Sequence, residues 1–327
     1  MAAGLKLALV VSCALLLAES CHGALEVGYY RKTCPRAEAI VRGEVTRAVA
    51  ADAGIGAGLI RLLFHDCFVQ GCDASVLLDP TPENPQPEKL ALPNRTLRGF
   101  EVIDAAKGAI EDTCPSTVSC ADIVAFAARD ASYLLSGSRI NFRVPAGRLD
   151  GRRSNATETF DFLPGPFFNL SQLVGSFAAK GLGVEDMVTL SGAHSVGRAH
   201  CSSFIKDRLA TPSTINSTFA SSLRRRCLAQ TRTSDDPAVS QDAVTAASLD
   251  SQYYKNVLAN RGLLTSDAAL LSSPETTRMV QDNAADTNRR WERNFGKAMV
   301  KMAGIEVKTG AHGEIRKRCR FVNKRLS

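Results

Sequence analysis

Hydrophobic side chains recur at helical spacing along most of this chain. Val41, Val45 and Val49, for example, mark one face of a helix that we expect to run roughly over residues 35–52. The same spacing, or a run of helix-forming residues, predicts further helices over residues 59–68, 100–110, 121–135, 170–179, 184–191, 253–260 and 276–302.

Residues 144–166 break this pattern because they are rich in proline and glycine, and we expect an extended connection there. Strand signals are sparse, and the sequence has no internal repeat and no long low-complexity tract. The pattern therefore predicts a mainly α fold, with two helical halves joined near residues 140–165. With 327 residues and 45% apolar content, the chain can bury one large core or two modest lobes.

The amino terminus has a different character. Lys6 precedes an apolar run from Leu7 to Ala18, and small or polar residues follow through Gly23. This order is typical of a secretory signal peptide and is too short and wrongly flanked for a membrane anchor. We expect residues 1–23 to be removed near Gly23 or Ala24. Nothing later in the chain approaches the apolar length that a membrane span needs.

The cysteines support export. The chain has ten cysteines, of which Cys13 and Cys21 fall in the removed segment. An even set in an exported protein predicts four disulfides, although the count alone leaves the pairing open. Zinc is the competing interpretation, but no pair has the C-x-x-C spacing of a structural zinc site. The eight remaining cysteines are Cys34, Cys67, Cys72, Cys114, Cys120, Cys201, Cys227 and Cys319.

Glycosylation triplets and charge extend this picture. Four triplets begin at Asn94, Asn155, Asn169 and Asn216, which is consistent with a secreted glycoprotein. The formal net charge is +7. The basic residues are scattered, so the sequence does not favour nucleic acid as a partner. A positive protein outside the cell is nevertheless attracted to acidic polysaccharide.

Residues 61–75 carry the strongest chemical signal. Arg61 and His65 are four residues apart, so on a helix they project from one face. Peroxide cleavage needs this pair of groups. A neutral base takes a proton from one peroxide oxygen and returns it to the other, while a permanent cation stabilises the developing charge. The alternative is a structural histidine that bonds to a carbonyl.

The same segment offers a possible cation site. Oxygen donors alternate along a tight, glycine-containing loop, as in calcium sites, although the EF-hand pattern is missing. Cys67 and Cys72 could close this loop beside His65. The donors, which we call the first oxygen set, are the side chains of Asp66, Asp73 and Ser75 and the carbonyls of Val69 and Gly71.

The run L-I-R-L-L-F-H-D-C-F-V-Q-G-C-D-A-S-V-L-L at residues 59–78 resembles the distal signature of the class III secretory plant peroxidases. A second run, M-V-T-L-S-G-A-H-S-V-G-R-A-H-C at residues 187–201, is similar to their proximal signature, and the resemblance extends across the mature chain. It implies haem b, two calcium ions and a plant-peroxidase-like fold. A distal half of about residues 24–145 and a proximal half of about 165–327 would enclose the haem.

The resemblance also assigns roles around the haem. His194 would be the axial iron ligand, with Asp267 of the run G-L-L-T-S-D accepting the proton of its ring. Asn94, backed by Glu88, would hold His65 in the tautomer that leaves Nε2 free. Because one amide cannot readily both hold His65 and carry a sugar chain, Asn94 should carry no glycan. His200 stays unassigned, since its spacing of six from His194 does not suit a zinc pair.

Three further features follow from the resemblance. Pro164 and Phe168, together with Phe64, would line the exposed haem edge where donors bind, and Leu149 stands where many members carry arginine. The proximal calcium ligands, which we call the second oxygen set, would be Ser195, Asp242, Thr245, Ser248 (through its carbonyl) and Asp250. The implied disulfides are Cys34–Cys114, Cys67–Cys72, Cys120–Cys319 and Cys201–Cys227.

We therefore predict a monomeric haem enzyme, secreted to the cell wall space, that oxidises phenols one electron at a time with hydrogen peroxide. Two other interpretations remain. His65 next to Cys67 suggests a hydrolase, although an oxidised cysteine lacks the free thiolate that such an enzyme needs. The positive charge suggests a catalytically silent protein that binds wall polysaccharide. Neither nucleic acid nor membrane is an expected partner.

Overall fold

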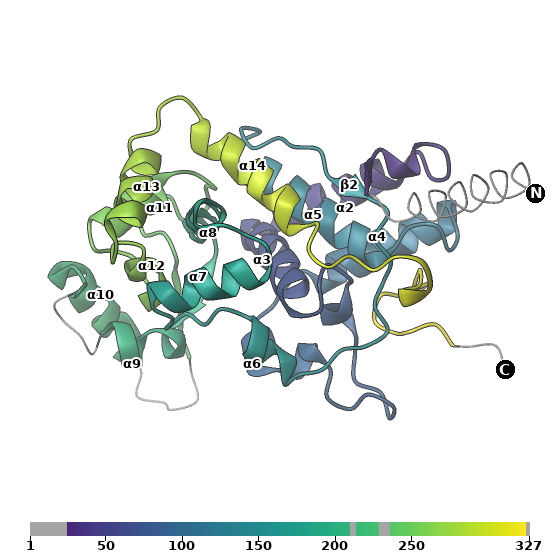
Figure 1. The fold of residues 1–327 in the computed structure, drawn as a ribbon, viewed down its shortest axis with the longest axis horizontal. Coiled ribbons are helices and arrows are strands. Elements are labelled where there is room, and N and C mark those ends of the chain that lie inside the picture. Colours follow the sequence, from purple (N-terminus) through teal and green to yellow (C-terminus); the bar gives the residue numbers. More distant parts are fainter. Residues whose placement is uncertain (1–24, 210–213, 229–235, 325–327) are drawn as a thin grey trace, which may run out of the picture.

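The computed structural model describes residues 25–209, 214–228 and 236–324, so the predicted signal peptide lies outside the described residues. The described part is mainly helical, as predicted (Figure 1). Its helices are α2 (Ala37–Ala51), α3 (Ala53–Val69), α4 (Phe100–Thr113), α5 (Cys120–Leu135), α6 (Glu158–Phe162), α7 (Leu170–Ala179), α8 (Val184–Ser191), α9 (Ile205–Arg208), α10 (Ser217–Leu228), α11 (Gln252–Leu258), α12 (Thr265–Ala269), α13 (Pro274–Ala284) and α14 (Arg290–Met302). The strands are β1 (Glu26–Val27), β2 (Pro145–Ala146), β3 (Arg198–His200) and β4 (Ala238–Ser240).

Helix α3 runs through the middle of the molecule and begins six residues before its predicted start at residue 59. Three early glycines hid this start because glycine is a poor helix former. Asp52 caps the helix by accepting the Gly54 N–H at 2.7 Å. At Gly58, a side-chain Cβ would come within 3.1 Å of the Arg98 carbonyl oxygen. The glycine thus allows the backbone of α3 to approach the segment that leads into α4.

The predicted helix over residues 276–302 is two helices. Helix α13 ends at Ala284, and α14 begins at Arg290 after a turn in which Arg289 is left-handed, with φ 58°. Asp286 fixes the new direction by accepting the Trp291 N–H at 2.8 Å. Trp291 itself is fully buried. Sequence spacing could not reveal this break because both pieces keep the apolar period of a single helix.

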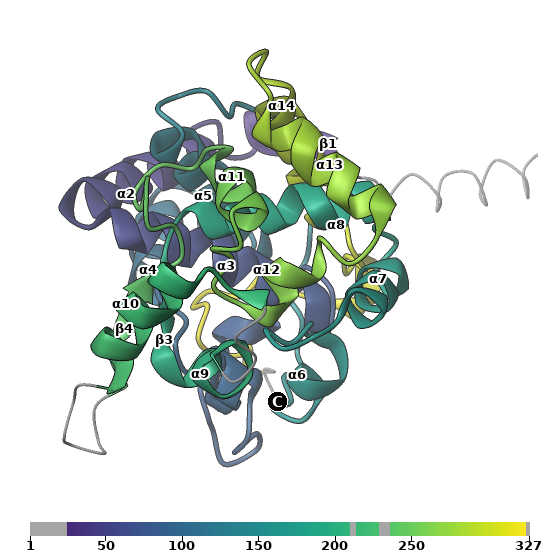
Figure 2. The same ribbon diagram turned by 90° about the vertical axis from the view of Figure 1, so that its left-hand side faces the viewer.

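Two-stranded antiparallel sheets pair β1 with β2 and β3 with β4. The main core runs through both halves of the molecule. A smaller apolar cluster joins α10, β3, β4 and the residues that flank α9, which lie together in Figure 2. This second cluster also contains Leu263 and Leu264, which lead into α12.

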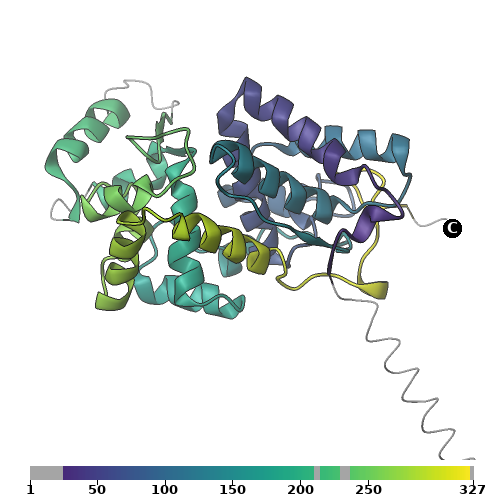
Figure 3. The ribbon, with the colours of Figure 1, turned by 90° about the horizontal axis from the view of Figure 1, so that it is seen from above.

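The C-terminal segment returns to the first half of the chain. In Figure 3 the purple and blue helices lie on one side, the green helices on the other, and α14 reaches between them. After α14, the Ile305 carbonyl accepts the Cys72 N–H, and the Arg320 carbonyl accepts the Asp79 N–H, both at 3.0 Å. Residues 305–323 were predicted within the second half by sequence order, yet they pack against the first.

Four disulfides link the described residues, in the pairs that the resemblance implies. They are Cys34–Cys114, Cys67–Cys72, Cys120–Cys319 and Cys201–Cys227. The Cys120–Cys319 bond joins cysteines that are 199 positions apart in the sequence, and it attaches the returning C-terminal segment to the start of α5. No helix in the described ranges is long and apolar enough to cross a membrane.

The connection over residues 144–166 is mostly extended, as predicted, but it contains the short strand β2 and the short helix α6. Arg148 in this connection is fully buried and donates to Asp122 at 2.6 Å. The neighbouring Leu149 is half-buried, and its N–H donates to the Lys308 carbonyl at 3.1 Å. Leu149, the departure from the arginine of many family members, therefore lies where the connection contacts the C-terminal segment.

Candidate active site

The last turns of α3 place Arg61 and His65 side by side, as their spacing predicts. His65 is only 5% exposed, and its Nδ1 lies 2.7 Å from Oδ1 of Asn94. Since an amide oxygen can only accept, Nδ1 carries the proton in this contact. The other ring nitrogen, Nε2, accepts from Nε of Arg61 at 3.1 Å. His65 thus has a lone pair on Nε2, which is the form that a general base requires.

Arg61 is held by two further contacts. Its Nη1 donates to Oγ1 of Thr96 and its Nη2 to the Pro93 carbonyl, each at 2.9 Å. Burial, together with the positive charge of Arg98, lowers the pKa of Arg61 to about 10. The guanidinium therefore stays charged at neutral pH. Thr96 was not singled out from the sequence, where it reads only as the third residue of a glycosylation triplet.

Burial also lowers the pKa of His65 well below its usual value, and the charge of Arg61 adds to the effect. The hydrogen bond with Asn94 acts in the opposite direction. The imidazole is consequently neutral at pH 7, with its lone pair available.

Asn94 is buried and uses both atoms of its amide. Its Nδ2 donates to the main-chain carbonyl of Glu88 at 2.8 Å, while Oδ1 faces His65. Glu88 therefore supports Asn94 through its backbone rather than through its carboxylate. Both carboxylate oxygens of Glu88 are buried and have no hydrogen-bond partner among the described residues. Burial and the charge of Asp66 raise the pKa of Glu88 well above its usual value.

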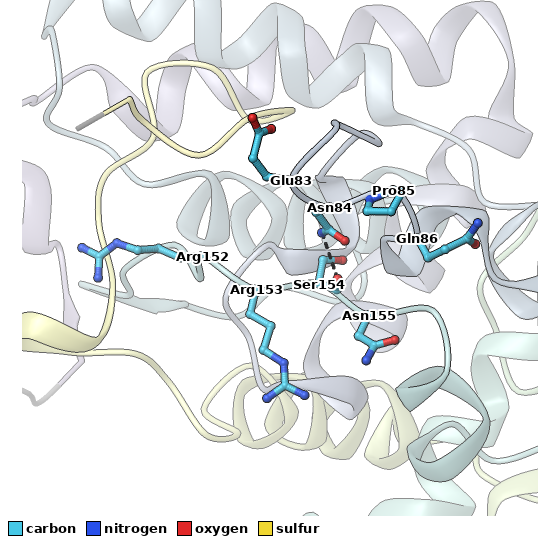
Figure 4. Close-up of a pocket in the computed structure, with 8 residues that line it drawn as sticks. All are labelled: Glu83, Asn84, Pro85, Gln86, Arg152, Arg153, Ser154 and Asn155. Carbon is cyan, nitrogen blue, oxygen red and sulfur yellow. Dashed lines mark hydrogen bonds between the residues drawn. The ribbon is translucent and has the colours of Figure 1, made fainter. Parts of the chain in front are cut away.

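A surface pocket borders the residues that fix Glu88. The pocket has a volume of about 410 Å³ and is lined by residues 83–86 and 152–155 (Figure 4). Within its wall, Nδ2 of Asn84 donates to the Ser154 carbonyl at 2.9 Å. The Ser154 hydroxyl in turn accepts the Glu88 N–H at 2.9 Å. Through these two hydrogen bonds, the loops around the pocket hold in place the Glu88 backbone to which Asn94 donates.

The second histidine, His194, follows α8 in a short 3-10 helix, Gly192–Ser195. Its Nδ1 lies 2.8 Å from Oδ1 of Asp267 at the start of α12. The same Oδ1 accepts the Tyr253 hydroxyl at 2.9 Å, and Oδ2 accepts the Leu264 N–H at 2.8 Å. The His194 side chain is 38% exposed, and its Nε2 has no partner in the described part of the chain.

Asp267 is 2% exposed, and burial alone raises the pKa of its carboxyl. The charge on His194 and the hydrogen bonds that Asp267 accepts outweigh burial, so the pKa lies below its usual value. Tyr253 is an additional member of this site. Nothing in the sequence pattern marks it, because it occupies an ordinary core position of α11.

Residues 163–169, the segment predicted to bind the reducing substrate, contact the start of α12, which carries Asp267. The Ser266 N–H donates to the Pro166 carbonyl at 2.9 Å, which ties residues 163–169 to the start of α12. Pro164 and Phe168 are half-buried, and the Phe168 ring lies 5.5 Å from that of Phe167, which is 57% exposed.

On the other side of the site, the Phe64 ring lies 5.5 Å from the His65 ring. His200 lies outside this arrangement, since its Nδ1 contacts the Asp236 carbonyl at 2.8 Å.

The first oxygen set is buried and incompletely satisfied. Oδ1 of Asp66 and Oγ of Ser75 have no hydrogen-bond partner among the residues described. Burial and the charge of Asp73 raise the pKa of Asp66 well above its usual value. Gly71 is left-handed, with φ 89°, and a Cβ there would lie 2.5 Å from the Glu306 carbonyl oxygen. Only glycine fits at this turn of the loop. The Val69 carbonyl accepts weakly, with Nζ of Lys180 at 3.4 Å.

Most of the second oxygen set converges as well. Oγ of Ser195 accepts the Asp250 N–H at 3.2 Å, and Thr245 contacts both Asp242 and Asp250 through its hydroxyl. Ser248 lies in the same loop, where its N–H donates to the Thr245 carbonyl at 2.9 Å. Nowhere in the described ranges do three His, Cys, Asp or Glu side chains gather as a metal site. A cation at either set would therefore need hydroxyl and carbonyl oxygens in addition to the two carboxylates of that set.

The hydrolase interpretation is wrong for the fold described here. The Cys67 sulfur is bonded to Cys72, so it provides no thiolate beside His65. The disulfide instead closes the loop that carries the first oxygen set.

Comparison with known proteins gives the family. A sequence model described as Peroxidase matches residues 41–286. The chain is 60% identical to Peroxidase 2 of Zea mays over 94% of its own length and 93% of the relative's. It is 49% identical to Peroxidase 1 of Zea mays, over 98% and 89% of the two chains. It is 44% identical to Peroxidase 39 of Arabidopsis thaliana, over 91% and 93%. With two histidines in two buried hydrogen-bond networks and this degree of identity, the chain belongs to the peroxidase family and is a class III plant haem peroxidase.

Proposed function

We propose that this peroxidase cleaves hydrogen peroxide with His65 as acid and base and Arg61 as the stabilising charge, and that it oxidises small phenols near Pro164. The tautomer of His65 carries this proposal. Its Nδ1 proton is committed to Asn94, so Nε2 is left to accept a proton, and Arg61 already contacts that same atom at 3.1 Å.

The residues present fit a haem between the two histidines. His194 offers a partly exposed ring whose Nδ1 is held by Asp267, which is the arrangement of an axial ligand with its supporting acceptor. A bound haem supplies the iron at which the peroxide O–O bond is broken. His194 would hold that iron, and Asp267 would give the imidazole more anionic character.

His65 and Arg61 would divide the work on the peroxide. His65 takes a proton at Nε2 from the peroxide oxygen that stays, then delivers it to the oxygen that leaves as water. Arg61 stabilises the negative charge that develops as the bond breaks. Because His65 is buried and Arg61 is half-buried, their electrostatic effects are stronger than they would be in water.

Phenolic donors would bind where the 163–169 segment reaches the surface. The exposed Phe167 ring and the half-buried Phe168 ring offer aromatic contacts, and the Pro164 carbonyl offers an acceptor for a phenol hydroxyl. The bond from Ser266 to Pro166 fixes this segment relative to Asp267. This backbone hydrogen bond would therefore connect the donor site to the iron site.

Calcium is proposed at both oxygen sets. The unpartnered buried oxygens of Asp66 and Ser75 support the first, because a hard cation would satisfy them and relieve the repulsion between Asp66 and Asp73. The convergence of Asp242 and Asp250 on Thr245 supports the second.

We also propose secretion to the cell wall space as a monomeric glycoprotein. The signal-like amino terminus and the four disulfides support export. A net charge of +7 supports attraction to acidic wall polysaccharide, as a property of the enzyme rather than as its whole function. The family assignment favours catalysis over a silent binding protein.

Three histidine variants test the proposal. His65→Ala should keep the Soret absorbance of bound haem but react with peroxide about 10²–10⁴-fold more slowly, as expected for loss of an acid–base group. His194→Ala should lose haem or hold it weakly. His200→Ala is the matched control and should resemble the parent, because His200 contacts Asp236 outside the site. A normal peroxide rate in His65→Ala would overturn the proposal.

A further inference from the structure

Arg208 is a buried cation that bonds to no anion within the described ranges. It is the last residue of α9 and is 2% exposed. Its Nε donates to the Gly262 carbonyl at 3.1 Å, and its Nη1 donates to Oγ1 of Thr214 at 2.8 Å. Its Nη2 is buried and has no hydrogen-bond partner among the residues that the structure describes. Among the described residues, no Asp or Glu oxygen lies within salt-bridge distance of this guanidinium.

A buried charge of this kind is costly and calls for a compensating interaction at longer range. Asp267 supplies part of this compensation. Burial lowers the pKa of Arg208, and the negative charge of Asp267 is the influence that opposes it. The two groups therefore attract each other across the turn that separates them, without direct contact.

The backbone supplies a second connection between Arg208 and Asp267. The carbonyl that Arg208 holds belongs to Gly262, and a Cβ on Gly262 would lie 2.9 Å from Cβ of Asp267. Leu264, two residues later, donates its N–H to Asp267. Arg208 thus forms a hydrogen bond with the start of a turn, at Gly262, and the same turn donates a hydrogen bond from Leu264 to the Asp267 carboxylate.

We propose that Arg208 is a positioning residue of the proximal site, whose unpaired positive charge limits how strongly Asp267 polarises His194. The inference rests on the proposed role of His194 as iron ligand. A carboxylate that faces a nearby cation is a weaker acceptor, so the imidazole keeps more of its proton. It then donates less electron density to the iron. The charge of Arg208 would in this way raise the reduction potential of the bound haem.

The test is the ferric–ferrous midpoint potential of the haem-loaded protein, measured by spectroelectrochemistry. Arg208→Gln removes the charge and should make the potential more negative, by roughly a three- to tenfold change in the ferric-to-ferrous ratio at fixed potential. A tenfold change corresponds to about 59 mV for one electron. Arg208→Lys keeps the charge and should stay close to the parent.

A matched control separates this effect from simple loss of an arginine contact. Arg224 donates at 2.8 Å to the carbonyl of Leu209, the residue that follows Arg208 in the sequence. Within the described residues, no hydrogen bond joins Arg224 to Asp267 or to the turn before it. Arg224→Gln should leave the potential unchanged. A purely structural role for Arg208 predicts the opposite sign in Arg208→Gln, because a loosened Asp267–His194 bond gives the iron less electron density and a more positive potential.

Asp267→Asn completes the design. In the parent background it should raise the potential, and a failure to do so would count against the role of Asp267 rather than that of Arg208. In the Asp267→Asn background, Arg208→Gln should have much less effect. If Arg208→Gln proves unable to bind haem, Arg208→Met, which also removes the charge, is measured in its place and should shift the potential in the same direction. An unchanged or more positive potential in Arg208→Gln, or a large shift in Arg208→Lys, overturns the inference.

Discussion

Asn94 is the residue whose replacement most directly tests how the base is prepared. Asn94→Val keeps a side chain of similar width but removes both hydrogen bonds of the amide. The Nδ1–H of His65 then loses its acceptor in a site that is almost closed to water, since His65 is 5% and Asn94 is 1% exposed. The imidazole should respond by moving its proton to Nε2, where it blocks the lone pair.

The size of the effect follows from the hydrogen bond. Stranding a buried donor costs about 1–3 kcal/mol. If the full cost falls on the reactive tautomer, its population decreases by roughly 5- to 150-fold, because each 1.4 kcal/mol is a factor of ten. The Glu88 carbonyl also loses one of its donors but keeps the Ala91 N–H at 3.0 Å, so the free energy of unfolding should fall by a further ~0.5–1.5 kcal/mol. We therefore expect a peroxide rate at least about fivefold below the parent in a less stable protein.

Asn94→Asp is the matched control. Its carboxylate still accepts from Nδ1, so the reactive tautomer survives, and its negative charge favours protonation of His65. The control loses the donor to Glu88 as well, which makes the stability loss common to both variants. Stopped-flow absorbance in the Soret region, under excess peroxide and at pH 7, gives the second-order rate for each protein.

The reasoning is refuted if Asn94→Val reacts within about twofold of the parent, or if Asn94→Asp is the slower of the two at pH 7. Both variants also delete the glycosylation triplet. Because the Asn94 amide is buried and both its oxygen and its nitrogen are hydrogen-bonded, the parent should carry no glycan there, and the intact masses of secreted parent and variants should show the same sugar content.

Other perturbations give equally definite expectations. Since burial and the charge of Arg61 lower the pKa of His65, the peroxide rate should stay level as the pH falls through 6.5 and decline only below it, where protonation removes the base; a midpoint above 6.5 in the rate–pH profile would contradict this assignment. Removing calcium with a chelator should lower the Tm in calorimetry, and Asp73→Asn should reduce that shift; an identical shift in both proteins would exclude Asp73 as a ligand. Arg148→Met strands the buried charge of Asp122 and should reduce the unfolding free energy in urea by about 3–5 kcal/mol, whereas a loss below about 1 kcal/mol would mean that the pair is dispensable.

Local sequence determined those helices in which the apolar period and the signals at the helix ends indicate the same bounds. Residues 170–179 and 184–191 form helices with the predicted bounds. At the first of these, Asn169 and Gln172 form a capping box that fixes the start. The pairing of Arg61 with His65 was likewise readable, because a spacing of four fixes their relative direction once the segment is helical.

Tertiary contacts decided what local preference could not. Helix α3 starts at Ala53 despite three glycines because the close approach of α5 and of residue 98 needs small residues there. The break at residues 285–289 depends on Asp286 capping Trp291, whose fully buried ring packs against Tyr254 and Phe295. The return of residues 305–323 to the first half rests on long-range backbone bonds and one disulfide.

The site divides in the same way. The sequence by itself determined the reactive types, namely a base and a cation on one helical face and a second histidine in a family motif. The family resemblance implied that Asn94 orients His65 and that Asp267 orients His194, but only the tertiary structure forms these contacts, since Asn94 is 29 residues and Asp267 is 73 residues away. The physical reason is that a hydrogen bond needs atoms within about 3 Å. Sequence spacing sets that distance within one helix, but only packing sets it between segments.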